Sequence, residues 1–293
     1  MREKIRKPFI TFCFLFGLAT TAVADDQEFK MIESVGIFDN TRIATFTTPV
    51  RARPSSGIFI YSHGMTSRTL YHSKLFKAVY EAGYDVMAYD LPGHGNSERT
   101  LGLRGGVKGF PQMTEVLDGI VKHSTEVFGS EKIFISGWSL GGLISTIYLQ
   151  QHPGVANAAV LYAPGIAFAF LDGNFSILSG VKSENLVSDK GLAETLRNDE
   201  SFFSIPPPCL AKALITGILG LDSNKYSTNT LLFTAGRDYF VSTPRTEAFF
   251  ESAKDKNAMT LETVNLANSL HDVENDVDSE TVIKTTIEYL NRN

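Results

Sequence analysis

A serine between two glycines is the strongest chemical signal in the chain, in the run G-W-S-L-G at 137–141. This run follows an apolar segment at 132–136 and opens an amphipathic stretch that ends before Pro153. Glycines at 137 and 141 permit a sharp strand-to-helix turn that raises the hydroxyl of Ser139 above a sheet. A helix that begins at this point also favours negative charge that develops there. The context predicts a nucleophilic serine rather than a structural glycine turn.

A serine hydroxyl is a poor nucleophile until a neighbouring base takes its proton. Only two histidines follow Ser139 in the chain. His152 lies at the far end of the predicted helix, so it points away from the serine. His271 lies in a loop between an apolar strand at 260–266 and the last predicted helix, where it can reach over the sheet edge. We therefore predict His271 as the base, the alternative being a solvated loop histidine.

An acid that holds the base should precede it in the chain. Asp238 comes directly after the apolar strand at 231–235, where a carboxylate can reach the Nδ1–H of His271. We predict Asp238 as this acid, the alternative being a turn-forming aspartate. Three other carboxylates lie too close to His271 in sequence to orient it: Asp272, Glu274 and Asp276. Asp222 lies in the inserted segment described below.

Attack by Ser139 on a carbonyl group would require donors for the developing oxyanion. The backbone N–H of Leu140 is one candidate donor, and the N–H of Met65 is the other. Met65 follows His63-Gly64 at the end of a predicted strand, and glycine lets the backbone come close. We expect His63 to be a buried, hydrogen-bonded structural residue and His94 to be a structural bridge in its loop rather than a base.

Short apolar runs alternate with amphipathic helical stretches along most of the chain. Continuous apolar runs are typical of parallel strands that are covered on both faces, and they occur at 57–62, 85–89, 132–136, 158–162 and 231–235. Helical patterns follow at 75–80 and 140–148, and a last helix is expected to be capped by Ser279. Residues 30–50 resemble an antiparallel pair that turns at Asp39-Asn40. The alternation predicts an α/β fold with a mostly parallel sheet.

The alternation stops between residues 165 and 227, where aromatic and aliphatic residues surround Pro206-Pro207-Pro208. We interpret residues 165–227 as a helical cap inserted over the sheet, with substrate-binding residues that the sequence does not identify. Irregular packing without a role in binding is the alternative. Residues 25–164 and 228–293 would then form the core domain.

The first residues have the layout of a cleavable secretory signal, with a basic start, an apolar run from Phe9 to Ala19 and A-V-A at 22–24. The prediction is therefore a signal peptide at 1–24 and a periplasmic or secreted protein; an uncleaved anchor is the alternative. Without residues 1–24 the net charge changes from −5 to −8, because four basic residues and one acidic residue are removed. This acidity argues against nucleic acid as a partner. Cys209 is then the only cysteine, so no internal disulfide is expected.

Several runs in fixed order extend the pattern around Ser139: His63-Gly64, D-L-P-G-H-G-N-S at 90–97, G-W-S-L-G-G at 137–142, G-R-D-Y-F-V at 236–241, and His271. Over residues 55–290 this set resembles the monoacylglycerol lipase and lysophospholipase-like group of α/β-hydrolases, also described as serine-aminopeptidase-like. The resemblance implies an eight-stranded, mostly parallel sheet flanked by helices, with a helical cap after the sixth strand. It further implies hydrolysis of small-molecule acyl esters without a metal or cofactor.

Matched residue by residue, the resemblance implies that Ser139 is the nucleophile, Asp238 the acid and His271 the base. Met65 and Leu140 match the oxyanion donors. The chain departs from the pattern where many relatives carry Glu-His soon after His-Gly, because M-T-S-R stands at 65–68. Residues 196–200 resemble a shifted form of the cap's basic-residue–Asp–Pro segment. The predicted signal is atypical of the cytosolic members.

Three classes of function follow from these observations. The first is a serine hydrolase that cleaves carboxylic esters of acyl chains, monoacylglycerol-like or lysophospholipid-like, through an acyl-enzyme intermediate. The second is an aminopeptidase-like amidase or a C–C hydrolase with the same three residues. An aminopeptidase needs acidic residues to hold an α-ammonium group, which the cap could supply from Glu184, Asp189, Glu194, Asp199 or Glu200. The third is a non-catalytic binding protein with an α/β-hydrolase fold.

Overall fold

A computed structural model describes residues 29–51, 54–175 and 179–293. Residues 31–293 form one compact unit, which is the part described below. The predicted signal peptide at 1–24 lies outside the described residues. Within the described ranges, every helix is too short or too polar to cross a bilayer.

One eight-stranded sheet runs through this unit in the order β1-β2-β4-β3-β5-β6-β7-β8. Its strands are β1 (Ile32–Phe38), β2 (Thr41–Thr47), β3 (Ile58–Ser62), β4 (Asp85–Tyr89), β5 (Ile133–Trp138), β6 (Ala158–Tyr162), β7 (Thr230–Ala235) and β8 (Leu261–Leu266). Strands β3 to β8 run parallel to one another, whereas β1 and β2 pair antiparallel with each other and β2 pairs antiparallel with β4. The predicted fold class is confirmed.

The β1–β2 hairpin turns at Asp39 and Asn40, as the sequence predicted. Both residues have positive φ, 45° and 53°, which a tight two-residue hairpin turn requires. Aspartate and asparagine tolerate this conformation better than most residues. The turn therefore fixes the register in which Phe38 faces Thr41.

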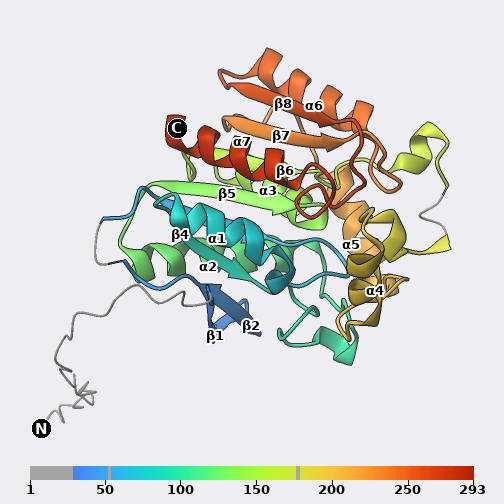
Figure 1. The fold of residues 1–293 in the computed structure, drawn as a ribbon, viewed down its shortest axis with the longest axis horizontal. Helices are drawn as coiled ribbons and strands as arrows, with labels where there is room; N and C mark the ends of the chain where they lie inside the picture. The colour runs from blue at the N-terminus through green and yellow to red at the C-terminus, as the bar shows by residue number, and fades with distance from the viewer. Residues whose placement is uncertain (1–28, 52–53, 176–178) are drawn as a thin grey trace, which may run out of the picture. The chain divides into compact units, whose positions relative to one another are not determined.

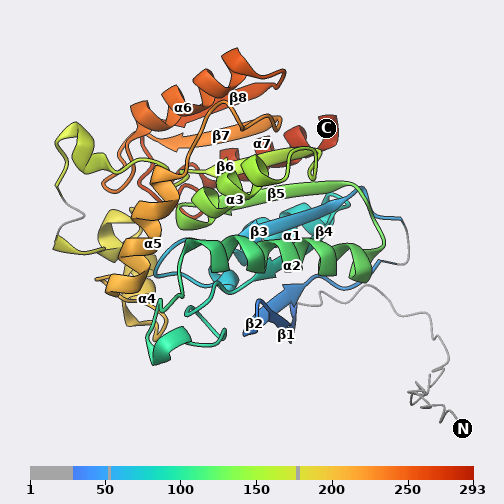
Figure 2. The same cartoon turned by 180° about the vertical axis from the view of Figure 1, so that it is seen from behind.

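Helices cover both faces of the sheet (Figures 1 and 2). Helices α1 (Ser73–Glu81) and α7 (Ser279–Arg292) pack together on one face, in front of the sheet in Figure 1. Helices α2 (Phe110–Phe128) and α3 (Leu140–Gln151) pack together on the opposite face, in front in Figure 2. Helix α6 (Thr243–Lys256) packs against β7 and β8. Because both faces are covered, the side chains of β3 to β7 are buried throughout.

The start of α7 differs from the sequence prediction. Ser279 is the first residue of the helix, and Asp278 occupies the capping position without a side-chain capping bond. The carboxylate of Asp278 accepts instead from the hydroxyl of Ser269, at 2.8 Å. The prediction of Ser279 as the cap is therefore wrong, because the preceding acid is engaged by the loop that leads into the helix.

Between β6 and β7 the chain leaves the sheet and forms short helices. These are the 3₁₀ turns at Ala169–Asp172 and Ser183–Asn185 and the α-helices α4 (Lys190–Asn198) and α5 (Pro208–Leu219). Helices α4 and α5 lie beyond the end of the sheet toward which the β5 arrow points (Figure 1). We refer to residues 165–227 as the cap segment.

Candidate active site

Ser139 lies between the end of β5 and the first residue of α3. Its backbone has φ 52° and ψ −116°, a conformation that non-glycine residues rarely adopt. The surrounding backbone holds it there: its N–H donates to the Tyr162 carbonyl at 3.0 Å, and its own carbonyl accepts from the Gly165 N–H at 2.7 Å. The hydroxyl is thereby raised above the carboxyl ends of the central strands.

Three glycines around Ser139 have no room for a side chain. A Cβ at Gly141 would overlap the carbonyl oxygen of Ser62 on the neighbouring strand. At Gly137 it would lie 2.5 Å from the backbone of Gly141, and at Gly142 it would lie 2.6 Å from Pro164. The motif therefore reflects close packing of backbone against backbone.

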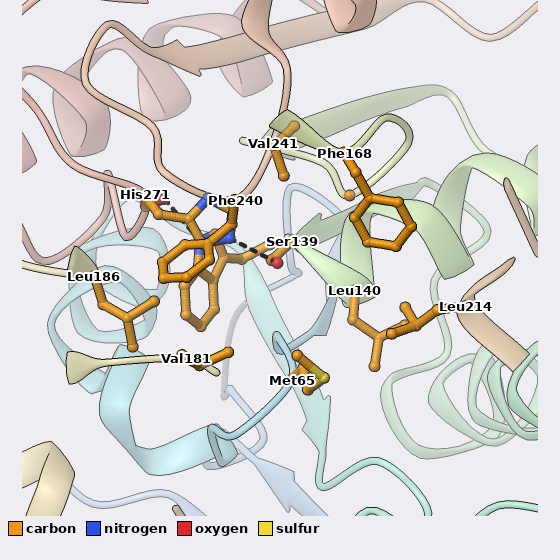
Figure 3. Close-up of a pocket in the computed structure, with 12 residues that line it drawn as sticks. Met65, Ser139, Leu140, Phe168, Val181, Leu186, Leu214, Phe240, Val241 and His271 are labelled. Carbon is orange, nitrogen blue, oxygen red and sulfur yellow. Dashed lines mark hydrogen bonds between the residues drawn. The ribbon is translucent and has the colours of Figure 1, made fainter. Parts of the chain in front are cut away.

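The structure brings the three residues predicted for catalysis into one hydrogen-bonded chain. His271 Nε2 lies 2.7 Å from the Ser139 hydroxyl oxygen, and His271 Nδ1 lies 2.7 Å from Asp238 Oδ2. Figure 3 shows the imidazole directed at the serine. The second oxygen of Asp238 accepts from the backbone N–H groups of Phe240 and Val241, at 2.8 and 2.9 Å. The carboxylate is therefore fixed on both sides, and it holds the imidazole with Nδ1 as donor and Nε2 free to accept the serine proton.

Aromatic side chains enclose the imidazole of His271, which is only 2% exposed. The rings of Trp138 and Phe240 lie 5.4 and 5.3 Å from it. The indole N–H of Trp138 also donates to the backbone carbonyl of His271, at 3.0 Å. The backbone of the base is thus tied to the strand that ends at the serine.

The predicted oxyanion donors, the N–H groups of Met65 and Leu140, belong to residues of the cavity at Ser139. Met65 and Leu140 line this cavity together with Ser139 and His271. A Cβ at Gly64 would lie 3.1 Å from the Cβ of Ser139, which shows how closely the loop before Met65 approaches the serine. Within the described part of the chain neither N–H has a hydrogen-bond acceptor. Two unpaired donors beside a serine hydroxyl can stabilise an oxyanion.

The other histidines considered from the sequence have structural positions. His63 donates from Nδ1 to the Gly64 carbonyl at 2.7 Å and accepts at Nε2 from the Leu91 N–H at 2.9 Å. Burial lowers the pKa of His63 well below its usual value, and burial lowers the pKa of His94 to about 4. His152 hydrogen-bonds to the Tyr148 carbonyl on its own helix. A buried structural role for His63 agrees with the structure, as does a structural role for His94, whose Nδ1 hydrogen-bonds to the Pro92 carbonyl of its own loop at 2.9 Å.

The cavity at Ser139 is mostly apolar (Figure 3). Besides Ser139 and His271 its walls come from Met65, Trp138, Leu140, Gly165, Phe168, Val181, Leu186, Leu214, Phe240 and Val241. A second cavity adjoins it, because both are lined by Met65, Phe168, Val181 and Leu214. The second cavity continues along Ser204, Pro206, Ala211 and Ile215 of the cap segment. We call these two adjoining cavities the apolar groove.

The acidic residues of the cap segment lie elsewhere. Asp189 accepts from the Leu192 N–H at the start of α4, and Asp199 pairs with Arg68 at 3.0 Å. Among the described residues, none of the five cap carboxylates named above lines the apolar groove. The groove therefore lacks the acidic partner that an α-ammonium group would require.

The loop at 267–278, which carries His271, contains contacts that the sequence did not predict. Asp276 accepts from the Ser188 N–H at 2.7 Å and from the Leu270 N–H at 2.6 Å. The Asp272 N–H donates to the Leu186 carbonyl at 2.9 Å. These bonds connect the loop of the base to residues 186–188 of the cap segment, of which Leu186 lines the groove. The only signal in the sequence is the acid-rich run H-D-V-E-N-D at 271–276.

Comparisons with known proteins agree with this architecture. Residues 53–278 match the family model described as serine aminopeptidase, S33. The chain is 28% identical over 142 residues to lysophospholipase L2 of Escherichia coli (strain K12), an alignment that covers 48% of this chain. It covers 39% of that relative, so the chain matches only about two fifths of the relative's length.

Two solved structures share the fold over most of both chains. A thermostable carboxyl esterase from Bacillus coagulans in complex with glycerol has a TM-score of 0.76 and 17% identity, covering 90% of this chain and 99% of the esterase. A soluble variant of monoglyceride lipase from Saccharomyces cerevisiae, in complex with a substrate analogue, has a TM-score of 0.74 and 15% identity, covering 92% of this chain and 97% of the lipase. The family match over 53–278 and the eight-stranded sheet lead to one conclusion: this chain is a member of the serine aminopeptidase S33 family of α/β-hydrolases.

Proposed function

We propose that this protein is a serine hydrolase that cleaves carboxylic esters of acyl chains through an acyl-enzyme intermediate. The hydrogen-bonded chain from Asp238 through His271 to Ser139 carries this proposal. Two unpaired backbone donors and an apolar groove meet at the same hydroxyl, so a nucleophile, a base and oxyanion donors share one cavity. A binding protein without catalysis would not need this arrangement.

In the proposed reaction His271 Nε2 takes the proton of Ser139 as the serine oxygen attacks the ester carbonyl carbon. The carbonyl oxygen becomes an oxyanion and accepts from the N–H groups of Met65 and Leu140. When the intermediate collapses, the bond to the alcohol oxygen breaks and His271 returns its proton to the leaving alcohol. Water then attacks the acyl-serine with His271 as base, and the carboxylic acid leaves. The Asp238 carboxylate, which hydrogen-bonds to His271 Nδ1, stabilises the imidazolium.

The apolar groove favours an apolar acyl chain in the acyl donor, and for this proposed role we call it the acyl groove from here on. Each methylene that leaves water contributes about 0.8 kcal/mol, which is roughly a fourfold gain per carbon. Monoacylglycerols and lysophospholipids combine such a chain with a polar alcohol. We propose these two classes as the substrates to test first, since relatives are named lysophospholipase and monoglyceride lipase.

The amidase alternative has less support from the structure. An aminopeptidase substrate would bring an α-ammonium group into a groove that no cap carboxylate lines within the described residues. Such a charge would be desolvated without a partner. Esters should therefore be cleaved far faster than aminoacyl amides.

The direct test is hydrolysis of p-nitrophenyl esters from acetate to palmitate by the wild type and by Ser139→Ala. We expect kcat/KM to rise with chain length in the wild type, and Ser139→Ala to reduce it about 10⁴-fold or more. Ser223→Ala is the matched control, because Ser223 hydrogen-bonds to Ser252 away from the site. Unchanged turnover by Ser139→Ala would refute the assignment of the nucleophile.

A second variant tests the groove separately from the chemistry. Leu214 lines both cavities, so Leu214→Trp should block the groove where they meet. We expect hydrolysis of the acetate ester to stay within about threefold and hydrolysis of the laurate ester to fall roughly tenfold or more. Equal losses on both esters would contradict the placement of the acyl chain.

We also propose that residues 1–24 direct export and are removed. The basic start, the apolar run and the A-V-A site support this. N-terminal sequencing of the protein purified from a secreting host should then begin at Asp25. An intact Met1 in the exported protein would contradict cleavage.

A further inference from the structure

A buried polar cluster lies behind the base and takes no part in the proposed reaction. His72, at the end of the 3₁₀ turn Thr69–His72, is 1% exposed, and Glu274 in the loop at 267–278 is also 1% exposed. His72 Nδ1 lies 3.1 Å from Glu274 Oε2. The hydroxyl of Tyr61 on β3 donates to the same oxygen at 2.6 Å and lies 3.0 Å from His72 Nδ1.

The cluster joins the two loops that supply the candidate donor and the candidate base. On one side His72 Nε2 lies 3.4 Å from the hydroxyl of Ser67, two residues after Met65. On the other side Glu274 comes three residues after His271. A buried polar connection therefore joins these two loops.

The ring of Trp138 lies against both sides of this connection. Its centre is 5.4 Å from the ring of His72 and 5.4 Å from the ring of His271. The indole also donates to the carbonyl of His271. A shift of His72 would therefore displace the aromatic wall against which the base packs.

The charges of the cluster favour a protonated His72. Burial acts to lower the pKa of His72, but the carboxylates of Glu274 and Asp272 raise it above its usual value. Burial raises the pKa of the Asp272 carboxyl to about 6. An imidazolium facing Glu274 is then a charge-assisted contact in a medium without water, where such contacts are strongest.

The same side chains could be taken for a metal site, since ligand atoms of His72, Asp272 and Glu274 lie within 4.8 Å of one another. Their lone pairs are largely engaged already. Both oxygens of Asp272 accept from the Asn275 amide, at 3.1 and 3.0 Å, and Glu274 Oε2 accepts from Tyr61. Hydrogen bonds therefore account for three of the four carboxylate oxygens without a cation, whereas Glu274 Oε1 is buried without a partner among the described residues.

We propose that His72 and Glu274 are a pair of positioning residues that lock the loop of His271 to the loop of Met65. The inference rests on the proposed function, because it assigns the pair to the geometry of that reaction. It predicts a specific defect: loss of the pair should misalign the base and the oxyanion donor while leaving the acyl groove intact. Displacements of about 1 Å at a reacting group can cost roughly 100-fold in rate.

The experiment measures kcat and KM of Glu274→Gln and His72→Phe on the best p-nitrophenyl ester of the wild type. Both substitutions keep nearly the shape of the side chain and remove the charge-assisted contact. We expect kcat to fall about 10- to 100-fold and KM to change by less than about threefold. Labelling of Ser139 by a fluorophosphonate probe should slow by a similar factor.

Tyr226→Phe is the matched control for the loss of a buried hydrogen bond. Tyr226, near the end of the cap segment, is fully buried against Phe250 of α6, hydrogen-bonds to Thr230 at 2.7 Å and does not line the groove. It should lower the melting temperature without changing kcat. The double variant His72→Phe/Glu274→Gln should be no slower than the slower single variant, because residues that act as one unit are not additive.

The outcomes separate this inference from the proposed function. A wild type that neither hydrolyses esters nor reacts with the probe would refute the function itself. If the wild type is active and the folded variants have unchanged kcat, only the positioning pair is refuted. The pair is also refuted if activity is lost on dialysis against EDTA and restored by a divalent metal. If either variant fails to fold, Tyr61→Phe removes only one hydroxyl of the cluster, and its kcat must fall about threefold or more for the inference to stand.

Discussion

The turn at 137–142 and the loop at 267–278 both present a side chain of the candidate active site, but different forces hold them in place. The turn is fixed by close packing, because Gly141 has no room for a Cβ against the carbonyl of Ser62. The loop is fixed by buried carboxylates, of which Asp276 accepts from the backbone of Leu270 and of Ser188. Steric exclusion at the turn tolerates no added atom, whereas the loop loses stability stepwise as individual hydrogen bonds are removed.

The largest effect should come from filling the turn. Gly141→Ala places a methyl group on the Ser62 carbonyl oxygen, so β3 and α3 would have to move apart. We expect the free energy of unfolding to fall by about 3 kcal/mol or more, and ester hydrolysis to be lost. Thermal denaturation and turnover measure both.

Gly191→Ala is the control for this substitution. Gly191 lies in the first turn of α4, where the nearest atom to an added Cβ is the Asp189 carboxylate at 3.3 Å. Alanine should be neutral or slightly stabilising there, because it is the better helix former. If Gly141→Ala behaved like Gly191→Ala, steric exclusion would not be what fixes the turn.

A smaller effect is expected when the loop loses its anchor. Asp276→Ala leaves the N–H groups of Leu270 and Ser188 without their acceptor, at a cost of about 1–3 kcal/mol for each group that stays buried. We expect a melting temperature roughly 5–10 °C lower and kcat about tenfold lower, measured on the same ester. Asp276→Asn keeps one acceptor and should be intermediate. An active, equally stable Asp276→Ala protein would mean that the cap contact does not hold the loop.

The smallest effect is a change in pH dependence. The raised pKa of Asp272, about 6, means that the folded protein binds this proton more tightly than the unfolded chain. Stability should therefore decrease as the pH rises from about 4 through 6, since the buried carboxyl must ionise beside Glu274. Asp272→Asn removes this term, so its melting temperature should match the wild type near pH 4 and exceed it by roughly 3–6 °C at pH 8.

Asp255→Asn on the exposed side of α6 is the control for charge alone and should leave the pH dependence unchanged. A parallel pair of curves for the wild type and Asp272→Asn would show that this carboxyl is already ionised at low pH. The loop would then be held by ionised carboxylates over the whole pH range measured. Loop and turn would differ only in the geometry of their contacts.

The difference between local packing at the turn and long-range hydrogen bonds in the loop also explains what could be predicted from the sequence. The positions of Ser139, Asp238 and His271 follow from local rules: glycines at a turn, an acid after a strand, a histidine before the last helix. The hairpin at Asp39-Asn40 follows in the same way. Helices α2 and α6 were not singled out from the sequence; only three residues of α6 are buried, Thr246, Phe250 and Ala253, which leaves a weak periodic signal.

The supporting contacts could not be predicted because they join distant parts of the chain. The hydrogen bond from Tyr61 to Glu274 spans 213 positions, and nothing in either local sequence indicates the other. Arg68 and Asp199 were noted separately, as a departure from the family pattern and as part of a shifted cap segment, but their pairing at 3.0 Å appears only in the structure. The prediction of Ser279 as the helix cap failed for a similar reason, because the preceding Asp278 accepts a hydrogen bond from Ser269 in the loop.

The backbone angle of Ser139 has a consequence for the stability of the whole protein. A non-glycine residue held at φ 52° destabilises the native state by about 1–3 kcal/mol relative to a residue that adopts this angle without strain. Glycine would relieve this strain, yet it would remove the hydroxyl. Thermal stability alone would give no reason to keep serine at this position, so the strain at Ser139 is the stability that the proposed nucleophile would cost the fold.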